Sequence, residues 1–272
     1  MKLGKKIIAC DIDGTLVTTD KKITPKTRET LVKFQRQGGV LVIASGRPVC
    51  GIEGCAKELE LDKFGGYIMA YNGGSVVNVK TKEVVCERFV DKEILPKAVS
   101  LAKEFGINLM TYQDKFLITE DDSEERIEIE KRINGLDVKV VDSLYDYIDF
   151  NIPKLLGIGA PEVIEKLEKV FKKELEGVNV FRSEPYFLEV TPMGVAKGDV
   201  LEELAEKLGY TIDDTAAFGD GYNDVNLIDR AAFGVAMDNA CDAVKEVADY
   251  VTDTNDNDGV AKAVEKFILL DD

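Results

Sequence analysis

The sequence predicts an α/β fold in which a parallel-sheet core is interrupted by an inserted α+β domain. Short apolar runs alternate with helical stretches over about the first eighty residues, and the same alternation resumes after residue 194. Between these two parts lie shorter strands and helices without that regular alternation. Alternating strands and helices are typical of βαβ units with right-handed crossovers.

The first part of the chain contains three apolar strands separated by helices. The run Lys6–Cys10 predicts a strand, and Thr24 followed by Pro25 predicts a helix start, because threonine caps free N–H groups and proline suits the first helical position. The run Val40–Ala44 is continuously apolar, which is typical of a strand buried on both faces of a parallel sheet. A helix over residues 49–61, a strand over 67–71 and an antiparallel hairpin over 75–79 and 84–89 complete this part.

The middle of the chain predicts a separate unit. Its expected helices cover residues 97–105, 123–134 and 161–174, and its expected strands cover 108–112, 138–141, 154–158 and 179–182. The later part returns to alternation, with helices expected over residues 199–208, 242–247 and 259–269 and strands over 215–218, 232–236 and 250–251. We therefore expect a Rossmann-like core of residues 1–82 and 189–272 and an inserted α+β domain over residues 83–188.

Composition excludes several classes of function. The 272 residues include 35 Lys and Arg against 51 Asp and Glu, and the net charge of −16 disfavours binding to nucleic acid or to an anionic membrane. No apolar run approaches the ~20 residues of a membrane span, and the start MKLGKK lacks a signal-peptide core, so we expect a soluble, cytoplasmic protein. The five scattered cysteines fit reduced thiols, and the absence of histidine excludes histidine-based catalysis. The oligomeric state is not indicated.

Two carboxylates stand where the first strand ends, at Asp11 and Asp13. Side chains at i and i+2 of an extended segment point the same way, so these two can share one site. Two like charges that close need a cation or a shared proton to relieve their repulsion. An Asp-Gly pair after a strand can also be no more than a turn, but polar residues at the other strand ends favour a site.

Functional groups follow three further strands. They are Ser45 with Arg47, Asn72, and Asp220 with Asn223 and Asp224. The carboxyl ends of parallel strands lie at one edge of a sheet, so these residues can meet there, and Lys197 at a helix start can add a positive charge. Without histidine, this set suits phosphoryl transfer better than serine-type hydrolysis. Mg²⁺ prefers hard oxygen ligands, for which Asp11 and Asp220 are the candidates.

These motifs resemble those of the haloacid dehalogenase (HAD) superfamily of phosphohydrolases, in particular the Cof-like branch with a type IIB cap. The resemblance rests on DIDGT at 11–15, SGRP at 45–48, the lysine of GVAKG at position 197 and GDGYND at 219–224, in the family's order. It implies a HAD-like catalytic core and a cap, residues 83–188, that sets substrate specificity. One position departs from the pattern. Tyr222 stands where related enzymes most often carry glutamate, which puts a supporting role of that carboxylate in doubt.

The resemblance also implies a role for each site residue. Asp11 is the expected nucleophile, forming an aspartyl-phosphate, while Asp13 protonates the leaving alcohol and then activates water. Lys197 is expected to offset charge in the transition state. The implied metal ligands are Asp11, Asp220, Asp224 and the backbone carbonyl of Asp13; the implied phosphate contacts are Ser45 and Asn223, and Arg47 and Asn72 line the substrate entrance. The implied enzyme is an Mg²⁺-dependent phosphatase of small phosphorylated metabolites, such as sugar phosphates or cofactor phosphates.

Other functions stay open at this point. A phosphomutase would use the same aspartyl-phosphate but form an isomer, and a noncatalytic regulator would bind phosphorylated ligands without hydrolysing them. Residues 254–265 also mimic a calcium loop, with Asp256, Asp258 and Glu265 near the required offsets. However, Thr254 holds the first ligand position, and a strand-like pair precedes it where a helix is needed, which disfavours a calcium role.

Overall fold

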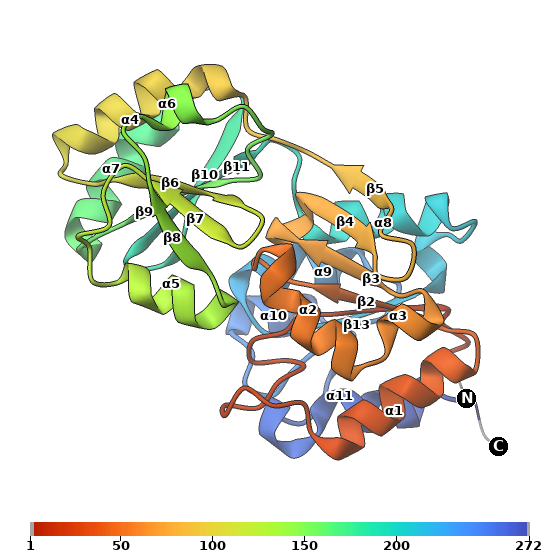
Figure 1. Cartoon of the computed structure of the whole chain (residues 1–272). Coiled ribbons are helices and arrows are strands. Elements are labelled where there is room, and N and C mark those ends of the chain that lie inside the picture. The colour runs from red at the N-terminus through yellow and green to blue at the C-terminus, as the bar shows by residue number, and fades with distance from the viewer. Residues whose placement is uncertain (1–2, 271–272) are drawn as a thin grey trace. The chain divides into compact units, whose positions relative to one another are not determined.

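The computed structural model describes residues 3–270 and divides the chain into two compact units (Figure 1). Unit 1 comprises Met1–Glu87 and Ala196–Asp272, and unit 2 comprises Arg88–Val195. Both joints lie several residues later than the sequence predicts. The hairpin that ends at Glu87 pairs into the sheet of unit 1, and the strand that ends at Pro192 pairs into the sheet of unit 2, so pairing decides where each unit ends.

An eight-stranded sheet forms the centre of unit 1, in the order β14-β13-β12-β1-β2-β3-β4-β5. All neighbouring pairs from β14 to β3 are parallel, whereas the pairs β3–β4 and β4–β5 are antiparallel. The strands are β1 (Ile7–Cys10), β2 (Val40–Ala44), β3 (Tyr67–Ala70), β4 (Ser75–Asn78), β5 (Val84–Glu87), β12 (Thr215–Gly219), β13 (Gly234–Ala236) and β14 (Tyr250–Val251). The predicted parallel α/β core is confirmed.

Seven α-helices among the described residues belong to unit 1; six of them lie between its strands in the chain, and the seventh follows the last strand. They are α1 (Pro25–Arg36), α2 (Val49–Glu58), α3 (Leu61–Phe64), α8 (Lys197–Lys207), α9 (Val225–Arg230), α10 (Asp242–Val247) and α11 (Gly259–Phe267). α1 packs against α11, and α8 packs against α9 (Figure 1). The helix predicted over residues 49–61 is two helices, because the left-handed backbone of Glu60 (φ 59°) separates α2 from α3.

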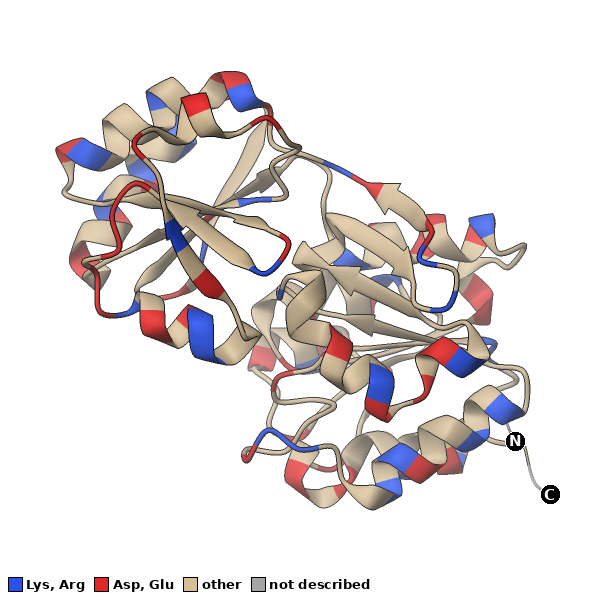
Figure 2. Ribbon diagram, viewed as in Figure 1, with Lys and Arg blue, Asp and Glu red and all other residues tan. Residues whose placement is uncertain are grey.

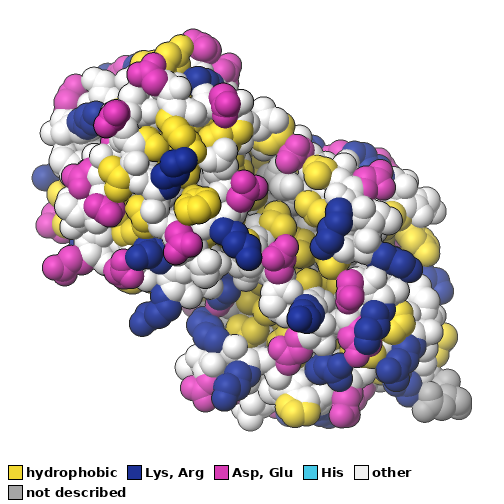
Figure 3. Space-filling model, in the orientation of Figure 1, with side chains coloured by type: hydrophobic (Ala, Val, Ile, Leu, Met, Phe, Trp, Pro, Cys, Tyr) yellow, Lys and Arg dark blue, Asp and Glu magenta, His cyan; other side chains and the backbone are white. Residues whose placement is uncertain are grey.

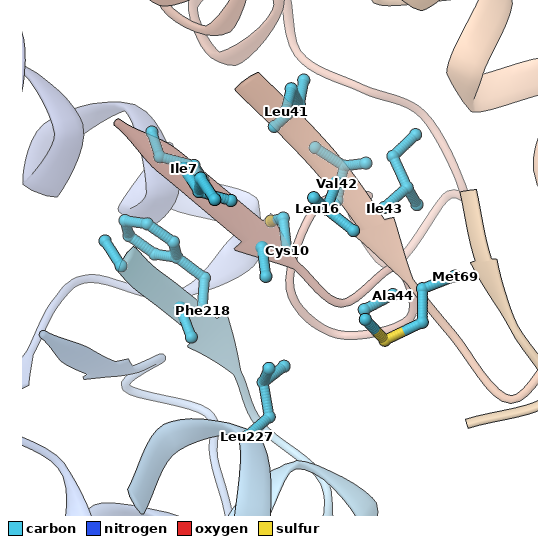
Figure 4. Close-up of a cluster of buried hydrophobic side chains, with 14 of the residues drawn as sticks. Ile7, Cys10, Leu16, Leu41, Val42, Ile43, Ala44, Met69, Phe218 and Leu227 are labelled. Carbon is cyan, nitrogen blue, oxygen red and sulfur yellow. The ribbon is translucent and has the colours of Figure 1, made fainter. Parts of the chain in front are cut away.

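Apolar side chains from the central strands form the core of unit 1. Ile7, Leu41, Ile43 and Phe218 are fully buried and lie among side chains from neighbouring elements (Figure 4). Every residue of β1 and β12 is buried, as expected for strands covered on both faces. The central strands therefore form a rigid base, and their carboxyl ends carry the polar residues.

A six-stranded sheet forms unit 2, in the order β10-β11-β9-β6-β7-β8. Its elements are α4 (Leu95–Glu104), β6 (Leu109–Gln113), β7 (Phe116–Thr119), α5 (Ile127–Asn134), β8 (Asp137–Val140), α6 (Leu144–Tyr147), β9 (Leu155–Ile158), α7 (Pro161–Glu174), β10 (Val178–Glu184) and β11 (Phe187–Pro192). The sequence pattern does not predict β7, β11 or α6. β7 follows β6 after a tight turn in which Asp114 is left-handed (φ 52°), and a short polar turn of this kind interrupts the apolar pattern only briefly.

Short 3₁₀ turns occur at Tyr71–Gly73, Lys92–Ile94, Ile212–Asp214, Tyr222–Asp224 and Asn255–Asn257.

Acidic and basic residues are distributed over the helices of each unit (Figure 2), and side chains of both signs are interspersed on the face shown in Figure 3. Among the described residues, no helix has the length and apolar character needed to cross a membrane.

Candidate active site

The carboxyl ends of four adjacent parallel strands bring the polar residues together. β12, β1, β2 and β3 are consecutive in the sheet, so residues that follow them lie along one edge. One contact spans this edge: the Asn223 amide, beyond β12, donates to the side-chain oxygen of Asn72, beyond β3, at 3.0 Å. The predicted meeting place of the four strand ends is present in the structure.

The turn after β1 depends on a glycine. Gly14 has a left-handed φ of 82°, and a Cβ at this position would lie 2.2 Å from Oδ2 of Asp220. Thr15, next in the chain, donates from its hydroxyl to Oδ1 of Asp220 at 2.6 Å. The DIDGT turn therefore both makes room for the Asp220 carboxylate and holds it.

Lys197 lies between two carboxylates at the first residue of α8. Its Nζ donates to Oδ1 of Asp11 at 2.7 Å and to Oδ1 of Asp224 at 2.6 Å, and its side chain is 0% exposed. The start of α8 is held because the Asn226 side-chain oxygen accepts the Gly198 N–H at 2.8 Å. A buried ammonium with two charged partners keeps a fixed position.

The Asp224 carboxylate accepts more hydrogen bonds than that of Asp11 or Asp220. Its Oδ2 accepts the backbone N–H groups of Asp220 and Gly221, each at 3.0 Å, in addition to the lysine bond on Oδ1. Gly219 permits this arrangement, because a Cβ there would lie 2.5 Å from the Cβ of Asp224. Asp224 thus fixes both the turn after β12 and the lysine.

The site carries more negative than positive charge. Burial, followed by the neighbouring Asp224 carboxylate, raises the pKa of Asp11 from 3.8 to about 8, against the opposing effect of Lys197. Burial raises the pKa of Asp220 to about 6, although the hydrogen bond from Thr15 opposes the rise. Burial alone would lower the pKa of Lys197, but Asp11 and Asp224 outweigh it and raise that pKa. One ammonium is therefore shared among acids that compete for it.

The Asp13 carboxylate points to a different set of partners. Arg47 binds it in a two-pronged arrangement, with Nε 2.8 Å from Oδ2 and Nη2 2.7 Å from Oδ1. Lys21 adds a third bond, from Nζ to Oδ1, at 2.7 Å. Partial burial opposes ionisation, but these two cations outweigh it and hold the pKa of Asp13 below its usual value. Asp13 is an ionised carboxylate in this arrangement.

The remaining predicted residues line the same edge. Ser45 is buried, and its hydroxyl oxygen accepts the Arg47 backbone N–H at 3.3 Å. Asn72 adopts a left-handed φ of 58° that asparagine tolerates better than most residues. Tyr222, the residue that departs from the family pattern, is 79% exposed. It makes no contribution to the buried charge cluster.

Three supporting residues were not singled out from the sequence. Thr15 binds Asp220, Lys21 binds Asp13, and the Asn239 amide donates to the Gly14 carbonyl oxygen at 2.8 Å. Thr15 belongs to the DIDGT motif, but the motif alone predicts no separate role for it. Lys21 and Asn239 lie in loops whose paths no periodic pattern reveals.

The charge and donor types of this cluster fit a divalent cation. Asp11, Asp220 and Asp224 each offer one carboxylate oxygen, and these oxygens lie within 4.8 Å of one another. Three carboxylates against the single Lys197 ammonium leave two negative charges, which one Mg²⁺ would balance. The side chain of Asp13 is turned to Arg47, so only its backbone carbonyl remains for the metal role predicted from the sequence.

The chain is similar to known proteins over almost its whole length. The family model described as haloacid dehalogenase-like hydrolase matches residues 8–264. The putative phosphatase YxeH of Bacillus subtilis is 32% identical, covering 97% of this chain and 98% of its own. The 5-amino-6-(5-phospho-D-ribitylamino)uracil phosphatase YcsE of the same organism is 32% identical, covering 97% and 96%.

Solved structures are also similar to the chain over almost its whole length. A haloacid dehalogenase-like hydrolase from Bacteroides thetaiotaomicron superposes with a TM-score of 0.92 at 40% identity, covering 96% of this chain and 99% of that one. A structure described as a HAD subclass IIB sugar phosphatase superposes with a TM-score of 0.83 at 26% identity, covering 96% and 98%.

Proposed function

Because the chain belongs to the haloacid dehalogenase-like hydrolases, we propose that it hydrolyses small phosphate monoesters through a covalent phosphoryl intermediate on Asp11. The resemblance carried by the four motifs is confirmed, and the chain is an enzyme of the phosphatase class. The observation that carries the proposed mechanism is the buried Lys197 that binds both Asp11 and Asp224, with Asp220 within reach of the same point.

Mg²⁺ would be held by Asp11, Asp220 and the backbone carbonyl of Asp13, with Asp224 in support. Oδ1 of Asp11 binds Lys197 and Oδ1 of Asp220 binds Thr15, so each residue has its second oxygen for a metal. Both oxygens of Asp224 already accept protein hydrogen bonds, which suits orientation better than direct ligation. When bound, Mg²⁺ supplies positive charge to the transferring phosphoryl group.

Asp11 and Asp13 account for every bond and proton transferred in the proposed reaction. The cycle starts with Asp11 ionised and with Asp13 carrying a proton that it takes up from water when the anionic substrate binds. A carboxylate oxygen of Asp11 bonds to phosphorus as the ester P–O bond breaks, and the leaving alkoxide takes that proton from Asp13. Water then attacks phosphorus and gives a proton to Asp13, and the bond from phosphorus to Asp11 breaks. Phosphate leaves, and both carboxyl groups return to their starting states.

Lys197 and the strand-end amides stabilise charge during these steps. The ammonium is already 2.7 Å from Asp11, so it is oriented before substrate arrives and need not reorganise. The Ser45 hydroxyl and the Asn223 amide donate to phosphoryl oxygens, and Arg47 and Asn72 line the entrance. Lys21 and Arg47 both bind Oδ1 of Asp13, whereas Oδ2 accepts one bond, from Arg47, so Oδ2 has a lone pair for the proton while the cations hold the carboxyl group in place.

Phosphorylated sugars and cofactors are the proposed substrate class, and unit 2 is the proposed specificity-setting cap. Two observations support this class. YcsE is named as a phosphatase of a phosphoribityl compound, and a similar solved structure is described as a sugar phosphatase. Within unit 2, the Tyr112 hydroxyl donates to Glu130 at 2.7 Å and the Arg182 guanidinium donates to Glu168 at 2.9 Å, so both side chains have partners in that unit.

A phosphate-release screen tests the proposal. The purified protein should release phosphate from one or more of a panel of sugar phosphates, pyridoxal phosphate, flavin mononucleotide and nucleotides, and only with Mg²⁺ present. Asp11→Asn should abolish release, whereas Asp62→Asn, at an exposed position on α3, should leave it unchanged. Turnover that survives Asp11→Asn would exclude Asp11 as the nucleophile, and isomer formation without free phosphate would indicate a mutase.

A further inference from the structure

The chain that follows the nucleophile strand forms a small hairpin that carries Lys21. The Thr18 N–H donates to the Lys22 carbonyl oxygen at 2.9 Å, and the Lys21 N–H donates to the Thr18 carbonyl oxygen at 2.8 Å. Lys21 occupies the left-handed position of this three-residue loop, with φ 60°. Lysine is uncommon in this conformation. The loop places its ammonium 2.7 Å from Oδ1 of Asp13.

A second segment, more than two hundred residues later in the chain, binds this hairpin through hydrogen bonds. Asp256 accepts two hydrogen bonds from Thr19, one from the backbone N–H at 2.7 Å and one from the hydroxyl at 2.8 Å. The Asn255 amide donates to the Val17 carbonyl oxygen at 2.9 Å. Both residues belong to the 3₁₀ turn Asn255–Asn257, between β14 and α11. We call Asn255 and Asp256 the latch.

The latch is also connected to the turn that contains the catalytic carboxylates. The Asn255 N–H donates to the side-chain oxygen of Asn239 at 3.0 Å, and the Asn239 amide in turn donates to the Gly14 carbonyl oxygen at 2.8 Å. Gly14 directly follows Asp13. A continuous series of hydrogen bonds therefore holds the chain at Gly14, Val17 and Thr19.

The latch belongs to the segment that mimics a calcium loop, and the other acidic residues of that segment also bind nearby side chains. Glu265, at the last ligand position of that pattern, binds Lys26 at 3.1 Å and accepts from Thr30 at 3.1 Å, both on α1. Asp258 accepts from Thr24, the N-cap of α1, at 2.5 Å. The acidic residues of this segment are directed at the chain between β1 and the middle of α1, rather than at a common point.

We propose that Asp256 and Asn255 are positioning residues of the active site, which act by holding the hairpin so that Lys21 stays against Asp13. The inference rests on the proposed function, because it assumes that Asp13 transfers protons. Lys21 and Asp13 are both partly exposed, with 59% and 41% of their side-chain areas accessible, so the ion pair by itself is weak. Its geometry depends on the hairpin, and the hairpin on the latch.

The test compares latch variants with matched controls from the same loop. Asp256→Ala and Asn255→Ala should each lower kcat by about 10-fold with KM changed less than about 2-fold, because a misplaced proton-transfer group slows chemistry more than binding. Asp253→Ala and Asn257→Ala are the controls. Asp253 pairs with Lys262 and Asn257 bonds Thr254, so neither contacts the hairpin, and both should keep the wild-type kcat.

A double-mutant cycle then tests whether the latch acts through Lys21. Lys21→Met should lower kcat to a similar extent, Lys21→Arg should restore most of it, and Asp256→Ala should have little further effect in the Lys21→Met protein. Additive losses in kcat would overturn the proposal, as would an unchanged kcat in Asp256→Ala.

Hydrogen exchange gives a readout that does not depend on catalysis. The amide protons of Thr18, Thr19 and Lys21 should exchange faster in Asp256→Ala than in Asp253→Ala, because the bond that anchors the hairpin is lost. Equal exchange in the two variants would refute the latch. A wild-type protein that releases no phosphate would refute the proposed function instead, and the exchange measurement would still decide whether the latch holds the hairpin.

Discussion

Replacing Lys197 by methionine should destabilise the metal-free protein strongly and make its stability depend more on Mg²⁺. The side chain is fully buried, with its ammonium 2.7 Å from Asp11 and 2.6 Å from Asp224. Methionine keeps an unbranched apolar side chain but removes the only cation bonded to these two acids among the described residues. The carboxylates then remain buried without a balancing charge.

The size of the effect follows from the spacing of the carboxylates. Oxygens of Asp11, Asp220 and Asp224 lie within 4.8 Å of one another. Two unit charges at that distance repel by about 3.5 kcal/mol at an effective dielectric constant of about 20. Proton uptake relieves part of this repulsion. Breaking a buried ion pair usually costs about 3 to 5 kcal/mol, and we expect Lys197→Met to fall in that range.

Urea unfolding with Mg²⁺ and with a chelator measures both effects. Mg²⁺ should stabilise Lys197→Met more than the wild type, since the cation replaces the lost lysine charge and binding to the folded state adds directly to stability. Lys57→Met, at an exposed position on α2, should shift stability by less than about 0.5 kcal/mol. The reasoning is refuted if Lys197→Met is as stable as the wild type in chelator, or if both proteins gain equally from Mg²⁺.

Three further predictions concern the turn after β1, the buried ion pair of unit 2 and the dependence of stability on pH. Gly14→Ala should abolish Mg²⁺-dependent activity, because its Cβ would lie 2.2 Å from Asp220 Oδ2 at a left-handed φ; activity and Mg²⁺ titration measure this. Lys154→Met should destabilise unit 2 by about 3 to 5 kcal/mol in urea unfolding, because it leaves buried Glu189, 3.1 Å away, without its cation. In chelator, the pKa of Asp11, raised from 3.8 to about 8, predicts that wild-type stability falls as pH rises through that window, since the folded state keeps a proton that the unfolded state loses; Asp11→Asn should flatten this dependence.

Matched variants make these predictions specific. Gly4→Ala adds a methyl group at a similar φ of 62° with no atom within 4 Å, so it should keep activity and Mg²⁺ affinity. The pair Lys154→Met with Glu189→Leu should recover much of the stability lost in Lys154→Met alone, because no buried charge is left unpaired. A double variant as unstable as the single one would show that packing, rather than charge, causes the loss.

The fold class and the meeting of the strand-end residues could be predicted because both follow from local patterns. Continuous apolar runs such as Val40–Ala44 indicate buried parallel strands, and the parallel arrangement alone brings residues after β12 and β1 to one edge. Lys197 was predicted from its motif. Its full burial between Asp11 and Asp224 depends on tertiary packing of α8 that its local sequence does not reveal.

The residues that sequence patterns did not reveal are those that act across loops. Lys21 reaches Asp13 because the hairpin adopts a left-handed turn, and Asn239 reaches Gly14 through a loop beyond β13. Neither has a hydrophobic period or a motif of its own. In unit 2, the sequence pattern does not reveal β7 and β11, because each joins its neighbour by a short turn and the two strands resemble one interrupted segment.

The proposed role of Asp11 as nucleophile would require a cation at this site in addition to Lys197. To act as the proposed nucleophile, Asp11 would have to be ionised, yet burial and Asp224 raise its pKa to about 8, which favours the protonated form near neutral pH. Lys197 cannot correct this alone, because Asp224 binds the same ammonium at 2.6 Å. A divalent cation on Asp11 and Asp220 would favour the ionised form of both. The proposed Mg²⁺ requirement would then follow from the charge balance of the folded chain as well as from substrate binding.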